Sequence, residues 1–210
     1  MSLLEEISAS LQKGDETQVA ELTKRAIAES IDPKEILDDG LVSAMDIIGK
    51  KFRNHDIFLP EVLLAARAMY AGMDLLKPLF LKDGMPNIGK VVIGTVQGDL
   101  HDIGKNLVGI MLRGAGFEII DLGKDVPPED FVDMAEREGA DVIGMSTLLT
   151  TTTPMMTRVI ELLKERGIEE KISTIVGGAP VSLELAQEIG ATAYGYDAAN
   201  AVEKVKELTG

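Results

Sequence analysis

The sequence contains no cysteine and no tryptophan, and only 4% of its 210 residues are aromatic. Without cysteine, the chain has neither disulfide bonds nor thiolate metal ligands. The scarcity of aromatic side chains argues against a surface on which nucleic-acid bases stack. These absences remove disulfide-stapled domains and thiolate metal proteins from consideration, and they count against single-strand nucleic-acid binders.

Positive charge is also in short supply, since 21 Lys and Arg face 35 Asp and Glu for a formal net charge of −14. An acidic surface repels phosphate backbones, so we expect no nucleic-acid partner. No window approaches roughly 18 uncharged apolar residues, so we expect no membrane partner either. The N-terminus lacks the basic start and apolar core of a signal peptide. A cytoplasmic protein is the expectation that remains.

Helical periodicity marks the first part of the chain. Apolar residues recur every three or four positions, and Asp32-Pro33 supplies a capping carboxylate followed by a proline suited to a first turn. Four helices are expected, with apolar lines that begin at Leu4, Val19, Leu37 and Val62. They predict a small antiparallel bundle as a first domain, residues 1–86, with a linker at 82–90.

From Lys90 onward, short apolar runs alternate with helical segments. Strands are expected at 91–96, 118–122, 141–146, 173–176 and 192–193, with helices at 103–115, after 128, and from about 154, 182 and 198. This alternation predicts a second domain, residues 90–210, built on a doubly wound five-stranded parallel sheet. Ligands of such sheets bind at the carboxyl ends of the strands, so the loops there are the ones to inspect.

The loop after the first of these strands holds one of only two histidines in the chain, His101. Asp99 precedes it by two residues, and a carboxylate there can fix one imidazole nitrogen and leave the other for a metal. One histidine cannot hold a free zinc ion, but it can be the axial ligand of a metal held by a macrocycle. Gly104 would let a flat ligand approach the start of the helix. The spacing fits equally well a solvated His101 with Asp99 as a helix cap.

Three motifs carry a resemblance to a known family. Asp99-Leu100-His101-Asp102-Ile103-Gly104 resembles the D-x-H-x-x-G signature of base-off, histidine-on cobalamin-binding domains. Ser146-Thr147-Leu148 resembles the family's S-x-L element, and Gly177-Gly178 resembles its GG element. The helical half is similar to the cap domain found in methionine synthase and in the corrinoid proteins of methanol and methylamine methyltransferase systems. The resemblance covers nearly the whole chain and implies a Rossmann or flavodoxin-like sheet domain behind a four-helix cap.

The resemblance also implies the cofactor and its contacts. The cofactor would be a cobalamin or a related corrinoid, with His101 as the protein ligand of its cobalt. Cofactor contacts are implied for Asp99, Leu100, His101, Asp102, Ile103, Gly104, Ser146, Leu148, Thr150, Thr152, Gly177, Gly178 and, in the cap, Phe58. Gly177 and Gly178 would give room to the nucleotide tail.

Two implied roles have competing interpretations. Thr152 matches a serine that lies beyond the carboxylate in methionine synthase, so Asp99, His101 and Thr152 would form the catalytic group; a polar helix start also explains the threonine run. Phe58, with Val62 and Met69, is similar to the cap surface that covers the corrin, although Val62 and Met69 also fit a bundle core.

The function that the resemblance implies is that of a corrinoid methyl carrier. It would accept a methyl group from a substrate-specific methyltransferase and donate it to a second methyltransferase with a thiol or tetrahydrofolate acceptor, and a reductive activase would restore it. The chain would then be a non-autonomous subunit. A cobalamin-sensing regulatory protein is the alternative, although no basic helix suggests DNA binding. The methyl donor is chosen by the partner, so the sequence leaves it open.

Overall fold

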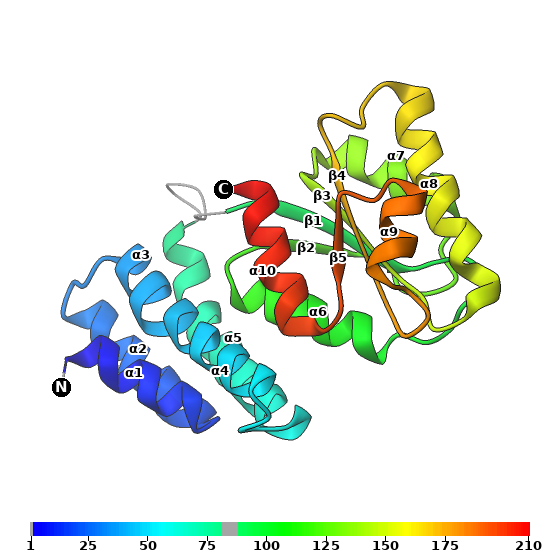
Figure 1. Cartoon of the computed structure of the whole chain (residues 1–210). Helices are drawn as coiled ribbons and strands as arrows, with labels where there is room; N and C mark the ends of the chain where they lie inside the picture. Colours follow the sequence, from blue (N-terminus) through cyan, green and yellow to red (C-terminus); the bar gives the residue numbers. More distant parts are fainter. Residues whose placement is uncertain (1, 81–87) are drawn as a thin grey trace. The chain divides into compact units, whose positions relative to one another are not determined.

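The computed structural model describes residues 2–80 and 88–210, which form two compact units (Figure 1). The first unit contains the N-terminal helices up to residue 80, and the second contains the sheet and its helices from residue 88 on, apart from residues 114–116. Most of the expected linker at 82–90 lies outside the described residues. Among the residues described, no helix combines the length and hydropathy that crossing a bilayer requires.

The first unit is entirely helical. Its elements are α1 (Leu3–Gln12), α2 (Glu16–Ala28), α3 (Pro33–Glu35), the π-helix η1 (Ile36–Val42), α4 (Ser43–Arg53) and α5 (Leu59–Phe80). The expected cap at Asp32 is confirmed, because its side chain accepts the N–H of Lys34, and the Asp15 side chain caps α2 by accepting the N–H of Gln18. These caps mark the starts of α2 and of the run α3–η1–α4, so the positions of these helix starts follow from local sequence.

The run from Pro33 to Arg53 differs from the single α-helix that its periodicity predicts. Residues Ile36–Val42 are wound as a π-helix between α3 and α4. Gly40 lies in this segment against α1, where a Cβ would stand 3.3 Å from Ile7 Cγ2. The spacing of apolar residues in the sequence cannot reveal such a local change of winding. The buried residues before and after a single π-helical turn are spaced nearly as they are in an α-helix.

The second unit is a five-stranded, all-parallel sheet with the strand order β2-β1-β3-β4-β5. The strands are β1 (Lys90–Thr95), β2 (Glu118–Asp121), β3 (Val142–Ser146), β4 (Ser173–Gly177) and β5 (Ala193–Gly195). The helices are α6 (Ile103–Gly114), α7 (Pro128–Glu138), the 3₁₀ turn η2 (Thr150–Thr152), α8 (Thr153–Arg166), α9 (Leu183–Ile189) and α10 (Ala198–Thr209). The prediction of a helical domain followed by a doubly wound parallel sheet is confirmed.

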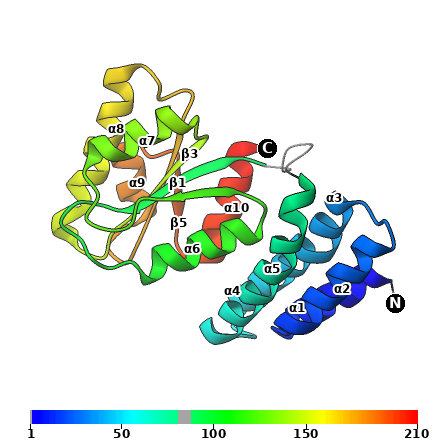
Figure 2. The same ribbon diagram turned by 180° about the vertical axis from the view of Figure 1, so that it is seen from behind.

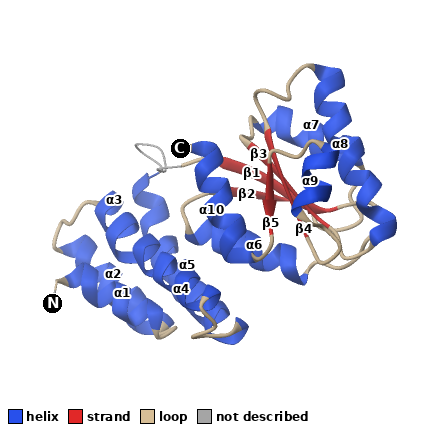
Figure 3. Cartoon of the chain, viewed as in Figure 1, coloured by secondary structure: helices blue, strands red, loops and turns tan. Residues whose placement is uncertain are grey.

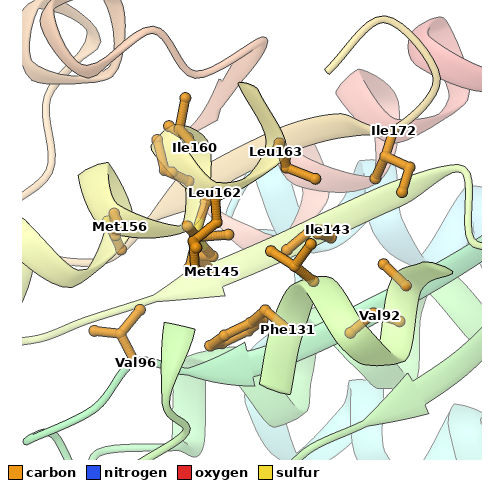
Figure 4. Packing of buried hydrophobic residues seen from close by; sticks show 14 of the residues in the cluster. Val92, Val96, Phe131, Ile143, Met145, Met156, Ile160, Leu162, Leu163 and Ile172 are labelled. Atoms are coloured by element: carbon orange, nitrogen blue, oxygen red, sulfur yellow. The ribbon is translucent and has the colours of Figure 1, made fainter. Parts of the chain in front are cut away.

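Helices cover both faces of this sheet (Figure 3). Helices α7, α8 and α9 lie on one face, and α6 and α10 lie on the other, as the two opposite views show (Figures 1 and 2). Alternate residues of the strands supply the two cores. Val92 and Ile143 meet Phe131 and the apolar side of α8 in the larger one (Figure 4). Gly94 makes room for this packing, since a Cβ there would lie 2.7 Å from the Phe131 ring.

The strand order places a topological switch point between β1 and β3. The chain leaves β1 toward one face of the sheet and leaves β3 toward the other, so the loops after these two strands diverge. Thr95 at the end of β1 pairs in register with Ser146 at the end of β3. The Asp99–Gly104 motif and the Ser146–Leu148 motif therefore emerge side by side at the edge where ligands of this architecture bind.

Candidate functional site

The loop after β1 holds His101 against Asp99. The Nδ1 of His101 lies 2.7 Å from Asp99 Oδ1, and the backbone N–H of His101 donates to the same oxygen at 2.9 Å. A carboxylate only accepts hydrogen bonds, so in the neutral imidazole Nδ1 carries the proton and Nε2 is the nitrogen with a free lone pair. The side chain of His101 is 56% exposed while that of Asp99 is fully buried. The buried carboxylate of Asp99 thus holds the ring of His101 so that its Nε2 is available at the surface.

The second oxygen of Asp99 is also occupied. Oδ2 accepts the hydroxyl of Thr147 at 2.8 Å and the backbone N–H of Leu148 at 2.5 Å, both from the loop after β3. Burial by itself would raise the pKa of Asp99, but the donors from Leu148, His101 and Thr147 together hold that pKa well below its usual range. Asp99 is therefore an ionised acceptor at neutral pH. It does not cap α6, because its donors are His101, Thr147 and Leu148, which lie outside that helix.

Thr147 is a member of this group that the sequence did not point to. Its Oγ1 lies 2.6 Å from the Oγ1 of Thr152, so Thr152 reaches Asp99 through Thr147. The available signal was positional: Thr147 directly follows β3, in the loop beside the Asp99 loop. The competing interpretation was that the threonine run is a polar helix start. Thr152 does stand at the N-cap of α8, but its side chain makes no capping hydrogen bond. The hydroxyl of Thr153 donates to the Thr150 carbonyl.

A third loop, after β2, braces the His101 loop from behind. Asp125 adopts a left-handed backbone conformation, with φ of 56°, and its Oδ1 accepts the N–H of Gly98 at 2.7 Å. Its own N–H donates to the Asp99 carbonyl at 3.0 Å. Thr95 in β1 donates its hydroxyl to the His101 carbonyl at 3.0 Å. Asp125 could not be identified from the sequence, because its role depends on β2 lying next to β1.

The start of α6 is anchored by an ion pair between a buried lysine and a partly exposed aspartate. Lys105 Nζ lies 2.5 and 2.6 Å from the two carboxylate oxygens of Asp121, and the Lys105 side chain is only 1% exposed. Asp121 ends β2 and also accepts the N–H of Gly123. A lysine this deeply buried needs such a partner. The pair fixes α6, and with it the loop that precedes the helix, to the edge of the sheet.

The outer side of the His101 loop is apolar and open. Leu100, Ile103 and Leu148 are between 47% and 75% exposed. A Cβ on Gly104 would meet no atom within 4 Å, so packing of the protein does not explain that glycine. Asp102 and Ser146 are half-buried and Thr150 is exposed. The residues expected to touch a cofactor in this unit thus gather around the carboxyl ends of β1, β3 and β4.

Gly177 and Gly178 have a role within the protein itself. A Cβ on Gly178, where φ is 121°, would lie 1.8 Å from the Thr147 carbonyl oxygen. A Cβ on Gly177 would lie 2.8 Å from the Gly195 carbonyl oxygen. Both glycines are required for the backbones of neighbouring loops and strands to approach, whether or not they also make room for a ligand.

In the helical unit, the residues expected to form the cap divide into two groups. Val62 and Met69 are buried, which agrees with a place in a bundle core. Phe58 is 65% exposed just before α5 and stays a candidate for a covering surface. His55 is exposed in the turn after α4, as expected of a solvated loop residue.

The donor set would suit one bond from the protein to a metal that a macrocycle already holds. The described residues contain no group of three or more His, Asp or Glu side chains that could hold a free metal ion. His101 offers one nitrogen, and the exposed apolar side chains with the open space at Gly104 suit the face of a flat ring. A corrinoid meets each of these requirements.

Comparison with known proteins agrees with this geometry. Residues 89–205 and residues 3–77 each match a family model described as a B12 binding domain. A solved structure of the methanol:cobalamin methyltransferase complex MtaBC from Methanosarcina barkeri superposes with a TM-score of 0.89 and 31% identity, over 99% of this chain and 79% of that one.

Curated relatives match over nearly their whole length. A corrinoid protein of Desulfitobacterium hafniense is 42% identical over 100% of this chain and 99% of the relative. Dimethylamine corrinoid protein 1 of Methanosarcina acetivorans is 44% identical over 98% of this chain and 97% of the relative. With both units matched and the histidine-bearing motif in place, the chain belongs to the family of corrinoid proteins that bind B12.

Proposed function

We propose that this chain is a corrinoid methyl carrier whose His101 Nε2 binds the cofactor's cobalt. The observation that carries the proposal is the His101–Asp99 pair, in which a buried carboxylate fixes the ring so that one nitrogen is free at the surface. When bound, the corrinoid supplies a cobalt ion that accepts a methyl group from one substrate and yields it to another. The remaining tasks belong to the protein.

The first of these tasks is to hold and orient the cofactor. Asp99 retains the proton on His101 Nδ1 and so keeps Nε2 available as a ligand. Leu100, Ile103 and Leu148 exclude water from the ligand nitrogen once a ring covers them. The remaining contacts proposed for the cofactor come from Asp102, Gly104, Ser146, Thr150, Thr152, Gly177 and Gly178, with Phe58 as a cover from the helical unit.

The second task is to meet partner proteins. The proposed partners are a substrate-specific methyltransferase that loads the methyl group, a second methyltransferase that passes it to a thiol or to tetrahydrofolate, and a reductive activase. The similarity to a dimethylamine corrinoid protein favours a methylated amine as the first donor to be tested.

A loading experiment tests the function. The chain is reconstituted with cobalamin, reduced, and mixed in turn with each methyltransferase encoded near its gene and with dimethylamine, trimethylamine, monomethylamine or methanol. Methylcobalamin formation, followed by absorbance, is expected only when one methyltransferase and its donor are both present. His101→Ala is expected to lose most of this methylation. If no combination loads the cofactor, and adenosylcobalamin instead gives light-dependent oligomers, the carrier function is wrong and a regulatory one takes its place.

A further inference from the structure

The strongest unassigned feature is the hydroxyl of Thr147, the middle residue of the Ser146-Thr147-Leu148 element. It is 1% exposed, and it stands between the buried Asp99 and the buried hydroxyl of Thr152. The family resemblance assigns roles to the first and third residues of the element, but none to the middle one. The contacts of Thr147 connect it to His101 through Asp99.

The hydrogen bonds of Thr147 have a fixed direction. A hydroxyl has one proton and two lone pairs, and a carboxylate only accepts, so Thr147 gives its proton to Asp99 Oδ2. Its lone pairs then face the N–H of Leu149 at 3.2 Å and the hydroxyl of Thr152 at 2.6 Å, whose single proton is shared between Thr147 and the Leu149 carbonyl at 3.0 Å. Thr152 therefore supports Thr147, whereas Thr147 supports Asp99 directly.

The backbone of Thr147 is held as firmly as its side chain. Its N–H donates to the Gly177 carbonyl at 3.2 Å, and its own carbonyl occupies the space that a Cβ on Gly178 would fill. A β-branched side chain has few rotamers, so a fixed backbone fixes the hydroxyl as well. The end of β4 thus determines where Thr147 stands, and Thr147 determines how Asp99 is held.

Water cannot replace this hydroxyl, since Asp99 and Thr147 are both buried. Without the hydroxyl, Asp99 Oδ2 would keep only the N–H of Leu148, and a buried carboxylate that loses a donor is poorly positioned. We propose that Thr147 is a positioning residue that fixes Asp99, and through Asp99 the tautomer and orientation of His101. This inference rests on the proposed function, since the purpose of that orientation is to bind cobalt.

The test compares Thr147→Val, Thr152→Val and Thr147→Ser with the wild type, with Thr174→Val as the matched control. Thr174 is a buried threonine near the amino end of β4, where its hydroxyl accepts the N–H of Thr192. The first readout uses the cofactor-free chain with ¹⁵N-labelled histidine and records the neutral tautomers of the imidazoles. The exposed His55 serves as an internal reference.

Thr147→Val is expected to reduce the fraction of His101 with its proton on Nδ1, and Thr147→Ser to restore it. The second readout is binding of cob(II)alamin together with the nitrogen hyperfine splitting of its electron paramagnetic resonance spectrum. Thr147→Val should weaken binding by about 10- to 100-fold, the usual effect of losing a group that supports a metal ligand. Thr152→Val should have a smaller effect, and Thr174→Val none.

A Thr147→Val chain that matches the wild type in both readouts would overturn the proposal, and so would a larger loss in Thr152→Val than in Thr147→Val. Failure of the proposed function is distinguishable from this. If the wild type does not bind cob(II)alamin, the carrier function is wrong, while the imidazole tautomers of the cofactor-free chain still decide the role of Thr147.

Discussion

The two sides of the loop that carries His101 differ in burial, polarity and connection. On the inner side, Asp99 is fully buried and each of its carboxylate oxygens accepts two hydrogen bonds. On the outer side, Leu100 and Ile103 are exposed, and Gly104 faces open space. His101, the proposed metal ligand, is therefore oriented before any cofactor arrives, so cofactor binding does not have to order this side chain.

The glycines repeat this contrast. Gly104 and Gly178 are both expected to leave room for a ligand, yet their surroundings in the structure differ. The space beside Gly178 is taken by the Thr147 backbone, whereas the space beside Gly104 is free. Substitutions on the inner side should therefore change the stability of the cofactor-free chain, and substitutions on the outer side should change cofactor binding instead.

The largest loss of stability is expected from Asp99→Ala. It leaves the buried Thr147 hydroxyl and the backbone N–H groups of His101 and Leu148 without their acceptor. We expect the free energy of unfolding of the cofactor-free chain to fall by about 3–5 kcal/mol. Urea denaturation measures it; a loss no larger than that of a surface substitution would contradict the inner-side role.

Asp99→Asn adds a pH dependence to the same comparison. Because the pKa of Asp99 is lowered in the folded chain, its ionisation stabilises the fold at pH values above the unfolded pKa of about 4. That stabilisation is lost as the pH falls toward the lowered folded pKa. The difference in stability between the wild type and Asp99→Asn should therefore be greatest near neutral pH and shrink below about pH 4. Denaturation curves from neutral pH down to about pH 2 measure it, and a difference that stays constant over this range would count against an ionised Asp99.

The next largest loss is expected from Gly178→Ala. A side chain at φ of 121° is strained, and its Cβ would displace the Thr147 carbonyl. We expect a cost of about 2–3 kcal/mol in the cofactor-free chain. The tautomer balance of His101 should also change, because Thr147 moves. If Gly178→Ala lowers cobalamin affinity while stability and tautomer stay the same, the glycine serves only the ligand.

A smaller loss is expected from Lys105→Met. It removes a buried ammonium but leaves Asp121, which is partly exposed and keeps the N–H of Gly123. We expect a loss of about 1–2 kcal/mol. The reverse change, Asp121→Asn, strands the buried charge of Lys105 and should cost more. Thermal unfolding of the two variants gives the order, and equal losses would argue against a buried charge pair.

The smallest change in stability is expected from Gly104→Ala. The added methyl group enters open space in the first turn of α6, and alanine favours a helix over glycine by up to about 1 kcal/mol. The cofactor-free chain should be as stable as the wild type or slightly more stable. Binding of hydroxocobalamin, measured by titration, should weaken because the methyl group meets the ring. Unchanged affinity would place the cofactor elsewhere.

Much of the fold could be predicted from the sequence, because it depends on local patterns. Short apolar runs between helical segments predicted the five strands, and Asp32 marked a helix start that the structure confirms. The π-helix at Ile36–Val42 could not be predicted, since its buried positions differ little from those of an α-helix.

The site was predictable only in part. The motif spacing pointed to Asp99 and His101, which lie two residues apart and contact each other. Thr147 and Asp125 were missed, because each meets the His101 loop only after distant strands have paired. Thr152 lies in the expected region, but its contact with Asp99 passes through Thr147, a residue that cannot be placed without the structure.

The most direct test records the electron paramagnetic resonance spectrum of the chain loaded with cob(II)alamin, after growth with either ¹⁴N- or ¹⁵N-histidine. If the Nε2 of His101 binds cobalt, the splitting by one nitrogen should change from three lines to two with the isotope, and in His101→Ala no splitting should change with the isotope. A splitting that stays the same in ¹⁵N-histidine protein would show that the nitrogen comes from the cofactor's own benzimidazole, and His101 would not be the ligand.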